Sequence, residues 1–207
     1  SNGESSTLVD LGGSSNNFNI HGSFQWIDDV PDLSSPDLEN PNTYFVPDQF
    51  SSIQAAIDNS IDGDTILVSA GTYYENINFD GKNISLIGED RNTTIIDGGA
   101  DGSVIHFENG ISETTQIKSF TIQNGHAEDG GGIYCINSSP KLIDIILKNN
   151  IADDDGAAIW MENSNPLIDS IVIYDNSADD HAGGIYCTNS SPNLISTTIY
   201  NNISNNE

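Results

Sequence analysis

Basic residues are scarce in this chain. Only 5 lysines and arginines stand against 31 aspartates and glutamates among 207 residues, which gives a formal net charge of −26. A surface of that sign repels nucleic acid and anionic membranes, so we exclude both as partners. No apolar run approaches the ~20 residues of a membrane-spanning helix, which argues against membrane insertion. We expect an exported protein, secreted or held at a cell surface.

One phrase of the sequence occurs three times, as GGGIYCINSSP (130–140), GAAIWMENSNP (156–166) and AGGIYCTNSSP (182–192). The period is therefore 26 residues, which points to a solenoid because a propeller blade needs ~40 residues or more. Three aligned columns stay aliphatic, so we expect them to share one interior. These columns are Ile133, Ile159 and Ile185; Leu142, Ile168 and Leu194; and Leu147, Ile173 and Ile199.

The repeating unit consists of short β-type runs separated by Asn-Ser-Ser-Pro and Asp-Gly turns, with no stretch that favours a helix. One coil of a parallel β-helix fits this unit, and each residue then lies ~4.8 Å above its counterpart. Asparagines in one column can hydrogen-bond to one another along such a stack. We expect that ladder at Asn124, Asn150, Asn176 and Asn202.

The stacking also makes a prediction about the two cysteines. Cys135 and Cys187 share a column with Met161 between them. Two coils separate them by roughly 9.6 Å, beyond the ~7 Å that a disulfide spans between Cα atoms. We therefore expect two buried thiols in a sulfur-containing core column.

Upstream of the clear repeats, SSIQAAIDNS (51–60) has apolar residues at helical spacing, and we expect it to cap the first coil. Short strands follow at 65–68, 76–79, 84–88 and 94–97. The order of this helix, then GDTILVSAGTYYENI, KNISLIGE and TTIIDGG, resembles the start of pectate-lyase-like right-handed β-helix proteins. That resemblance covers roughly residues 44–207 and implies an all-β, right-handed parallel β-helix domain there.

The resemblance is specific for the fold and weak for an activity, because this superfamily contains pectin methylesterases, polysaccharide lyases, polygalacturonases and surface proteins. The coils of this chain resemble those of the surface proteins most. The Arg-x-Lys element of polygalacturonases is absent, and the sole arginine, Arg91, lies in an early turn. We therefore expect that this protein is not an enzyme. If it has an enzymatic activity, we expect that of a polysaccharide lyase or a glycoside hydrolase.

Residues 1–43 lie outside the resemblance and are predicted to form an extended arm and a linker. Within this arm, Phe18, Ile20, Phe24 and Trp26 alternate with polar residues as in a strand.

Acidic turns follow the asparagine column in each coil. Glu128, Asp154 and Asp180 form one column, and Asp129, Asp155 and His181 form the next. Like charges ~4.8 Å apart need a cation, solvent or a shared proton. Three interpretations stay open: a solvated acidic turn; a calcium site, because Ca²⁺ binds several oxygens; and catalysis by Asp154, Asp180 and His181. The predicted metal ligands are Glu128, Asp129, Asp154, Asp155 and Asp180.

An aromatic column of Tyr134, Trp160 and Tyr186 alternates with a core column, so its rings should point outward. Such a row can form a platform for sugars or for a protein partner, or it can be covered by a loop.

Three functions remain: a structural or adhesive surface protein, a polysaccharide-binding module, and a polysaccharide-degrading enzyme. The residues of the last coil have no cap in the sequence, so we expect that layer to face water. Either a longer parent chain or the arm of a second copy can cover it. The second case predicts head-to-tail assembly into a fibre, with this protein as its own partner.

Overall fold

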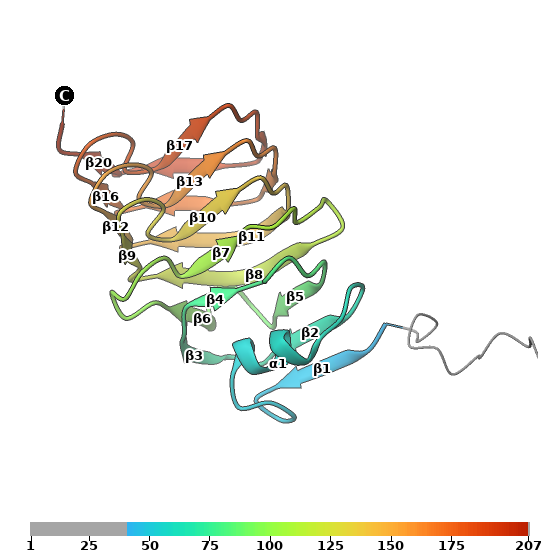
Figure 1. The fold of residues 1–207 in the computed structure, drawn as a ribbon. Helices are drawn as coiled ribbons and strands as arrows, with labels where there is room; N and C mark the ends of the chain where they lie inside the picture. The colour runs from blue at the N-terminus through green and yellow to red at the C-terminus, as the bar shows by residue number, and fades with distance from the viewer. Residues whose placement is uncertain (1–40, 207) are drawn as a thin grey trace, which may run out of the picture. The chain divides into compact units, whose positions relative to one another are not determined.

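The computed structural model describes residues 41–206, which form a parallel β-helix (Figure 1). Each strand pairs in parallel with the strand one coil away, and the named strands lie in three sheets along the stack. Among the described residues there is one helix, α1 (Ile53–Asn59), at the N-terminal end of the stack. The all-β fold expected from the sequence is confirmed. Residues 1–40 and Glu207 lie outside the described residues, and with them the four apolar positions predicted in the arm.

The largest sheet has 11 strands. Its strands are β1 (Thr43–Val46), β2 (Thr65–Val68), β3 (Gly71–Tyr74), β5 (Ser85–Gly88), β6 (Thr94–Asp97), β8 (Gln116–Gln123), β11 (Lys141–Lys148), β14 (Leu167–Asp169), β15 (Val172–Tyr174), β18 (Asn193–Ile195) and β19 (Thr198–Tyr200). The second sheet consists of β4 (Ile77–Asn78), β7 (Ile105–Phe107), β10 (Ile133–Ile136), β13 (Ile159–Glu162) and β17 (Ile185–Thr188). The third consists of β9 (His126–Ala127), β12 (Ile151–Ala152), β16 (Ser177–Ala178) and β20 (Ile203–Ser204).

The aliphatic columns predicted from the repeat are confirmed by the strand register. Ile159 pairs with Ile133 on one side and with Ile185 on the other. Ile168 and Ile173 occupy the same places in the other two columns and are both fully buried. The interior of the coils is thus one continuous apolar core, as alternation along each strand requires.

The asparagine ladder forms, but it is shorter than predicted. Asn150 Nδ2 donates to Asn176 Oδ1 over 3.0 Å, and Asn176 Nδ2 donates to Asn202 Oδ1 over 2.8 Å. The prediction for Asn124 is wrong, because its amide donates to Asp97 Oδ2 instead. Strand β8 pairs with β11 in a register in which Gln123 faces Lys148, so this coil is one residue shorter than those that follow. Gly125, not Asn124, therefore donates its N–H to Asn150 Oδ1.

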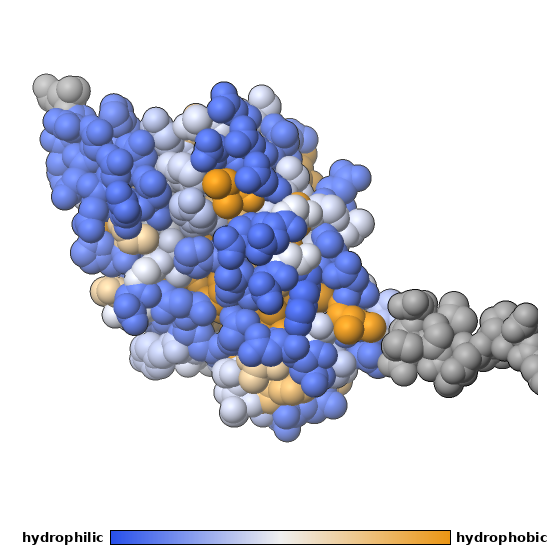
Figure 2. All heavy atoms as spheres, in the orientation of Figure 1, coloured by the Kyte–Doolittle hydropathy of each residue, from blue (hydrophilic) through white to orange (hydrophobic). Residues whose placement is uncertain are grey.

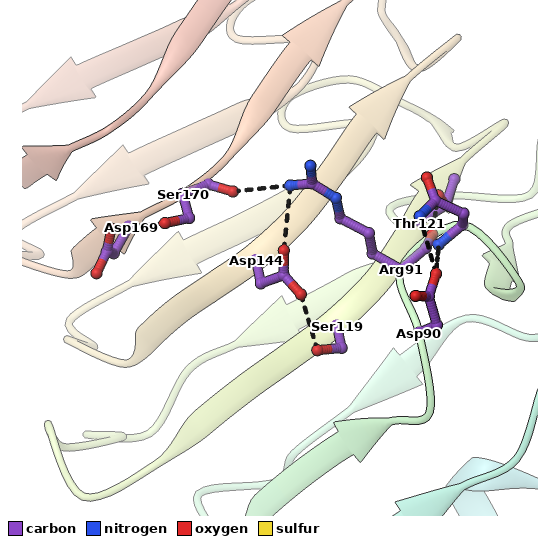
Figure 3. A network of polar contacts seen from close by, with 8 residues as sticks. Asp90, Arg91, Ser119, Thr121, Asp144, Asp169 and Ser170 are labelled. Atoms are coloured by element: carbon purple, nitrogen blue, oxygen red, sulfur yellow. Dashed lines mark hydrogen bonds and ion pairs between the residues drawn. The ribbon is translucent and has the colours of Figure 1, made fainter.

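A bend divides the largest sheet along a column of residues with positive φ. Ser119 and Asp144 lie at the bend within β8 and β11, with φ of 63° and 54°. In the next coil Ser170, with φ 59°, separates β14 from β15. Figure 3 shows that Arg91 reaches along this column. Its Nη1 donates to Ser170 O over 3.1 Å and lies 3.1 Å from Asp144 Oδ1. The sole arginine therefore links an early turn to coils much later in the sequence.

Helix α1 covers the N-terminal end of the core. Ser52 is its N-cap, and its inward face buries Ile53, Ala56 and Ile57, as the spacing predicted. Lys82 Nζ donates to the carbonyl oxygens of Ile57 and Asp58, both over 2.8 Å, at the end of the helix, where Ser60 N also donates to Ile57 O over 3.0 Å. This cap keeps the first layer of the core out of water.

The C-terminal layer of the described residues has no such cover. Cys135 and Met161 are buried in the predicted column, but Cys187 in the last coil is exposed. The prediction of two buried thiols is therefore wrong for Cys187, because no described layer packs on its coil. The register places Cys187 beside Met161, two coils from Cys135, and both cysteines are free thiols.

Candidate functional site

The acidic turns connect the third sheet to the second, and they stack on one another as the repeat predicted. Asp154 N donates to Glu128 O over 2.8 Å, and Asp180 N donates to Asp154 O over 3.0 Å. The turns form the hydrophilic surface near β12, β16 and β20 in the space-filling view (Figures 1 and 2). Because backbone bonds fix this stack, carboxylates of successive coils are held close together.

The second acidic column contains contacts between side chains and the next turn. Asp129 Oδ1 accepts from Asp155 N over 3.1 Å, and Asp155 Oδ1 accepts from His181 N over 2.9 Å. The ring of His181 joins this contact, with Nδ1 2.9 Å from Asp155 Oδ1 and 3.2 Å from Asp180 Oδ2, and the contact is an ion pair when the imidazole is protonated. The same carboxylate thus ties its coil to the next one and holds the imidazole.

These contacts bring five predicted residues into two overlapping groups. Asp129, Asp154 and Asp155 form one, and Asp155, Asp180 and His181 form the other, with potential ligand atoms within 4.8 Å of one another in each group. Glu128, also predicted as a ligand, belongs to neither group. The first group offers only carboxylate oxygens, the ligands that calcium prefers, whereas the second includes an imidazole, which suits transition metals.

The titration of these groups reflects their crowding. Loss of hydration, followed by the charges of Asp155, Asp180 and Glu128, raises the pKa of Asp154. Loss of hydration also raises the pKa of Asp129, against a lowering contribution from the hydrogen bond of Asp155. The hydrogen bond to Asp155, followed by the charge of Asp180, raises the pKa of His181. A cation bound in place of the His181 proton would therefore meet carboxylates that already lie close together.

The aromatic column lies directly beside these turns, which cover part of it. Tyr134 and Trp160 stack with ring centroids 4.7 Å apart and planes at 7°. Trp160 is only 9% exposed, so an open row of three rings is not present. The turns explain this: a Cβ added at Gly130 would lie 3.0 Å from Trp160 Cβ, so the turn packs closely against this strand.

Tyr186 does not extend a flat platform either. Its ring lies 6.0 Å from the ring of His181, at an interplanar angle of 36°. The acidic turn and the aromatic column therefore belong to one region. Trp160 alternates with the core residues Ile159 and Met161, and the turns cover its ring, so cover by a loop is the interpretation that fits this position.

The residues suggested for catalysis are brought together only in part. Asp180 and His181 form an ion pair, but their partner is Asp155, whereas Asp154 groups with Asp129. Sequence reasoning assigned Asp155 to the metal and left it out of the catalytic set. The signal for it was present, since Asp155 is followed 26 residues later by His181 in the same column.

Comparison with known proteins gives a fold and no family. No family model and no curated protein matches this chain. A crystal structure of pectin methylesterase in complex with hexasaccharide VII matches at 16% identity and a TM-score of 0.51, covering 68% of this chain and 52% of that one. Pectin methylesterase PemA from Erwinia chrysanthemi matches at 14% identity and a TM-score of 0.41, over 68% and 55% of the two chains. This chain thus spans about half the length of these enzymes. At such identity the likeness establishes the shared right-handed β-helix fold alone.

The described residues contain no helix that is long and apolar enough to cross a membrane.

Proposed function

We propose that this chain is a structural or adhesive β-helix protein, secreted or held at a cell surface, that assembles head to tail. The observation that carries this proposal is the last described coil. Leu194 and Ile199 are 44% and 47% exposed, although the residues in the same columns one coil earlier, Ile168 and Ile173, are fully buried. The apolar layer is the same, and none of the described residues packs on its outer side.

The exposed layer determines what a partner has to supply. Strands β17, β18, β19 and β20 each pair with the previous coil, which leaves their other edges without a described partner. Exposed strand edges pair with further strands, and the apolar layer prefers side chains that alternate in the same way. Phe18, Ile20, Phe24 and Trp26 of a second copy have that alternation, although they lie outside the described residues. A contact between an arm and a distant coil is heterologous, so it propagates into a fibre unless it closes.

Deletion of residues 1–27 tests the assembly. The full chain should elute as large, concentration-dependent species, whereas the deleted chain should elute as a monomer with an unchanged far-ultraviolet circular dichroism spectrum. Ile199→Asp should give the same result from the other side of the contact. Ile151→Asp is the matched control, because Ile151 is 43% exposed on the flank of the stack. A full chain that stays monomeric at high concentration contradicts the proposal.

We also propose that the acidic turns bind calcium, through Glu128, Asp129, Asp154, Asp155 and Asp180. The support comes from Asp129, Asp154 and Asp155, whose carboxylate oxygens lie within 4.8 Å of one another. Asp180 belongs to the second group, with Asp155 and His181, and Glu128 belongs to neither. Calcium should raise the melting temperature through mass action, and chelator should reverse the rise. Asp155→Asn should abolish the response because Asp155 belongs to both groups, whereas Asp153→Asn, in the same turn but outside them, should preserve it. Identical melting curves in calcium and chelator contradict calcium binding.

A polysaccharide-binding or polysaccharide-degrading protein is the second candidate. It is favoured by the fold shared with the pectin methylesterase that was crystallised with a hexasaccharide. Release of reducing sugar, unsaturated product or methanol from pectin, abolished by Asp180→Asn with His181→Gln, would support an enzyme. Binding without product formation would support a binding module, and neither result is expected if the protein is purely structural.

A further inference from the structure

The dipeptide Asn-Gly occurs three times in this chain, beginning at Asn2, Asn109 and Asn124. The first pair lies outside the described residues. Glycine has no Cβ, so its backbone nitrogen can approach the side-chain amide carbon of a preceding asparagine closely. That approach is the first step of deamidation, a slow reaction that converts asparagine into aspartate or isoaspartate. Because the reaction proceeds long after folding, the folded surroundings of each pair determine whether it takes place.

Asn109 and Gly110 form an exposed turn after β7, with φ of 62° and 81°. Within residues 41–206, neither Asn109 Nδ2 nor Gly110 N donates a hydrogen bond. A Cβ added at Gly110 would have no other atom within 4 Å, so there is open space around the glycine. The attacking nitrogen and the amide that it would attack are therefore both accessible, and no contact of the described chain holds them apart.

Asn124 and Gly125 have the same sequence but are held by the stack. Asn124 Nδ2 donates to Asp97 Oδ2 over 2.7 Å, and Gly125 N donates to Asn150 Oδ1 over 3.0 Å. Gly125 is buried, and a Cβ added there would overlap the carbonyl oxygen of Gly131 in the next coil. Attack by Gly125 N would require both hydrogen bonds to break and the two coils to separate.

The next coil shows that an asparagine with positive φ is not enough. Asn137 stands two residues after Cys135, as Asn109 does after its register partner Phe107, and its φ is 49°. Ser138 follows Asn137, and its N donates to Ser164 Oγ over 3.1 Å. The nitrogen that would attack is therefore engaged, and the serine side chain hinders its approach. Asn109 combines the same turn with a following glycine whose nitrogen has no partner among the described residues.

We propose that Asn109 deamidates spontaneously in the folded protein and that Asn124 is protected. Gly110 N loses its proton to hydroxide and attacks Asn109 Cγ. The Cγ–Nδ2 bond breaks, and ammonia leaves with a proton taken from water. The cyclic imide then adds one water molecule and opens to aspartate or isoaspartate. Either product adds a carboxylate beside Glu108 and one negative charge to the formal −26, and isoaspartate also adds a carbon to the backbone of the turn. The inference does not depend on the proposed assembly.

Incubation of the full folded chain in warm, mildly alkaline buffer, followed by peptide mapping with mass spectrometry, tests the proposal. Aspartate and isoaspartate should accumulate at position 109, and Asn124 should react at least about tenfold more slowly because its reaction needs local opening of the stack. The same chain in guanidinium chloride is the control, since both pairs should react there at similar rates. An Asn109 that reacts in the unfolded chain but not in the folded one would overturn the proposal, and so would equal rates at Asn109 and Asn124 in the folded chain.

A pair of glycine variants tests the role of Gly110. Gly110→Asn keeps a residue type that tolerates positive φ but adds a side chain, so it should slow the reaction at Asn109 severalfold. Gly102→Asn is the matched control, because Gly102 also has positive φ, 91°, and open space around it, and it should leave the rate at Asn109 unchanged. An unchanged rate at Asn109 in Gly110→Asn would contradict attack by Gly110 N.

Discussion

Replacement of Asn176 by leucine tests the ladder at its middle residue, which is buried. Asn176 is 1% exposed and its side chain takes part in five hydrogen bonds. Its Oδ1 accepts from the backbone N and from Nδ2 of Asn150, both over 3.0 Å, and its Nδ2 donates to Leu147 O, Tyr174 O and Asn202 Oδ1. Leucine has the same branched arrangement of side-chain heavy atoms and is somewhat larger, so the variant removes the bonds without opening a cavity.

The cost follows from which partners lose their hydrogen bond. The backbone N–H of Asn150 is fully buried and loses the acceptor on Asn176, while Asn150 Nδ2 keeps its bond to Ile122 O over 3.3 Å. Leaving one buried donor unpaired costs about 1–3 kcal/mol, and a typical bond contributes about 1 kcal/mol net. The free energy of unfolding should therefore fall by about 2–4 kcal/mol for Asn176→Leu.

Urea denaturation of the wild type and two variants measures this difference. Asn202→Leu is the comparison, because Asn202 accepts from the backbone N–H of Asn176 over 3.1 Å in the same way but is itself only half-buried, so water can replace part of what is lost. It should cost no more than about 1–2 kcal/mol. If Asn176→Leu changes the unfolding free energy by less than about 0.5 kcal/mol, or by less than Asn202→Leu does, the ladder does not stabilise the stack as argued.

Three further predictions use the same unfolding measurements. Lys82→Met should destabilise by about 1–2 kcal/mol, because it leaves the carbonyl of Ile57 at the end of α1 without its charged donor; no change would mean that water replaces the lysine. Arg91→Lys should lose stability because a single ammonium cannot match the geometry of the guanidinium beside Asp144, and full retention would show that only charge matters. The raised pKa of His181 means that its protonated form stabilises the fold below the ordinary pKa of 6.5, a contribution lost as pH rises through the raised value. The melting temperature of His181→Gln should thus approach that of the wild type in alkaline buffer, and a constant difference across pH would contradict this.

The strand register of the coils from β10 onward could be predicted, because residues at the same place in the repeat lie at the same place in successive coils. Residues 26 positions apart pair in the structure, as Ile159 does with Ile133 and Ile185. The ladder failed at Asn124 for a related reason: one residue fewer in that coil shifts the column, and a fixed period cannot detect a local deletion. Sequence therefore predicts a stacked fold well wherever coil length is constant.

For the candidate site, the sequence predicted which residues stack on one another, but not which other residues pack around them. Asp129, Asp155 and His181 stack as the spacing indicated. Cover of Trp160 by a turn was one of the alternatives left open, because alternation along a strand indicates which face a ring occupies but not whether a neighbouring turn covers it. The link from Arg91 to Ser170 spans 79 residues and has no signal in the local sequence.

Two polar columns run along the same coils, and their difference indicates where binding should occur. In the asparagine column every amide offers both donors and acceptors, so each coil satisfies the next and the column is stable without any other molecule. Carboxylates can only accept, so stacking Asp129 and Asp155 leaves negative charge that the coils themselves do not neutralise. One coil after Asp155, His181 occupies this column and pairs with the carboxylate of Asp155. The coils of Asp129 and Asp155 have no such donor in the column. We therefore expect Asp155→Asn to raise stability in the absence of cations, because an amide restores a donor to the column. If Asp155→Asn is destabilising in chelator, the contact with His181 outweighs the repulsion, and the case for a cation at these turns loses its physical basis.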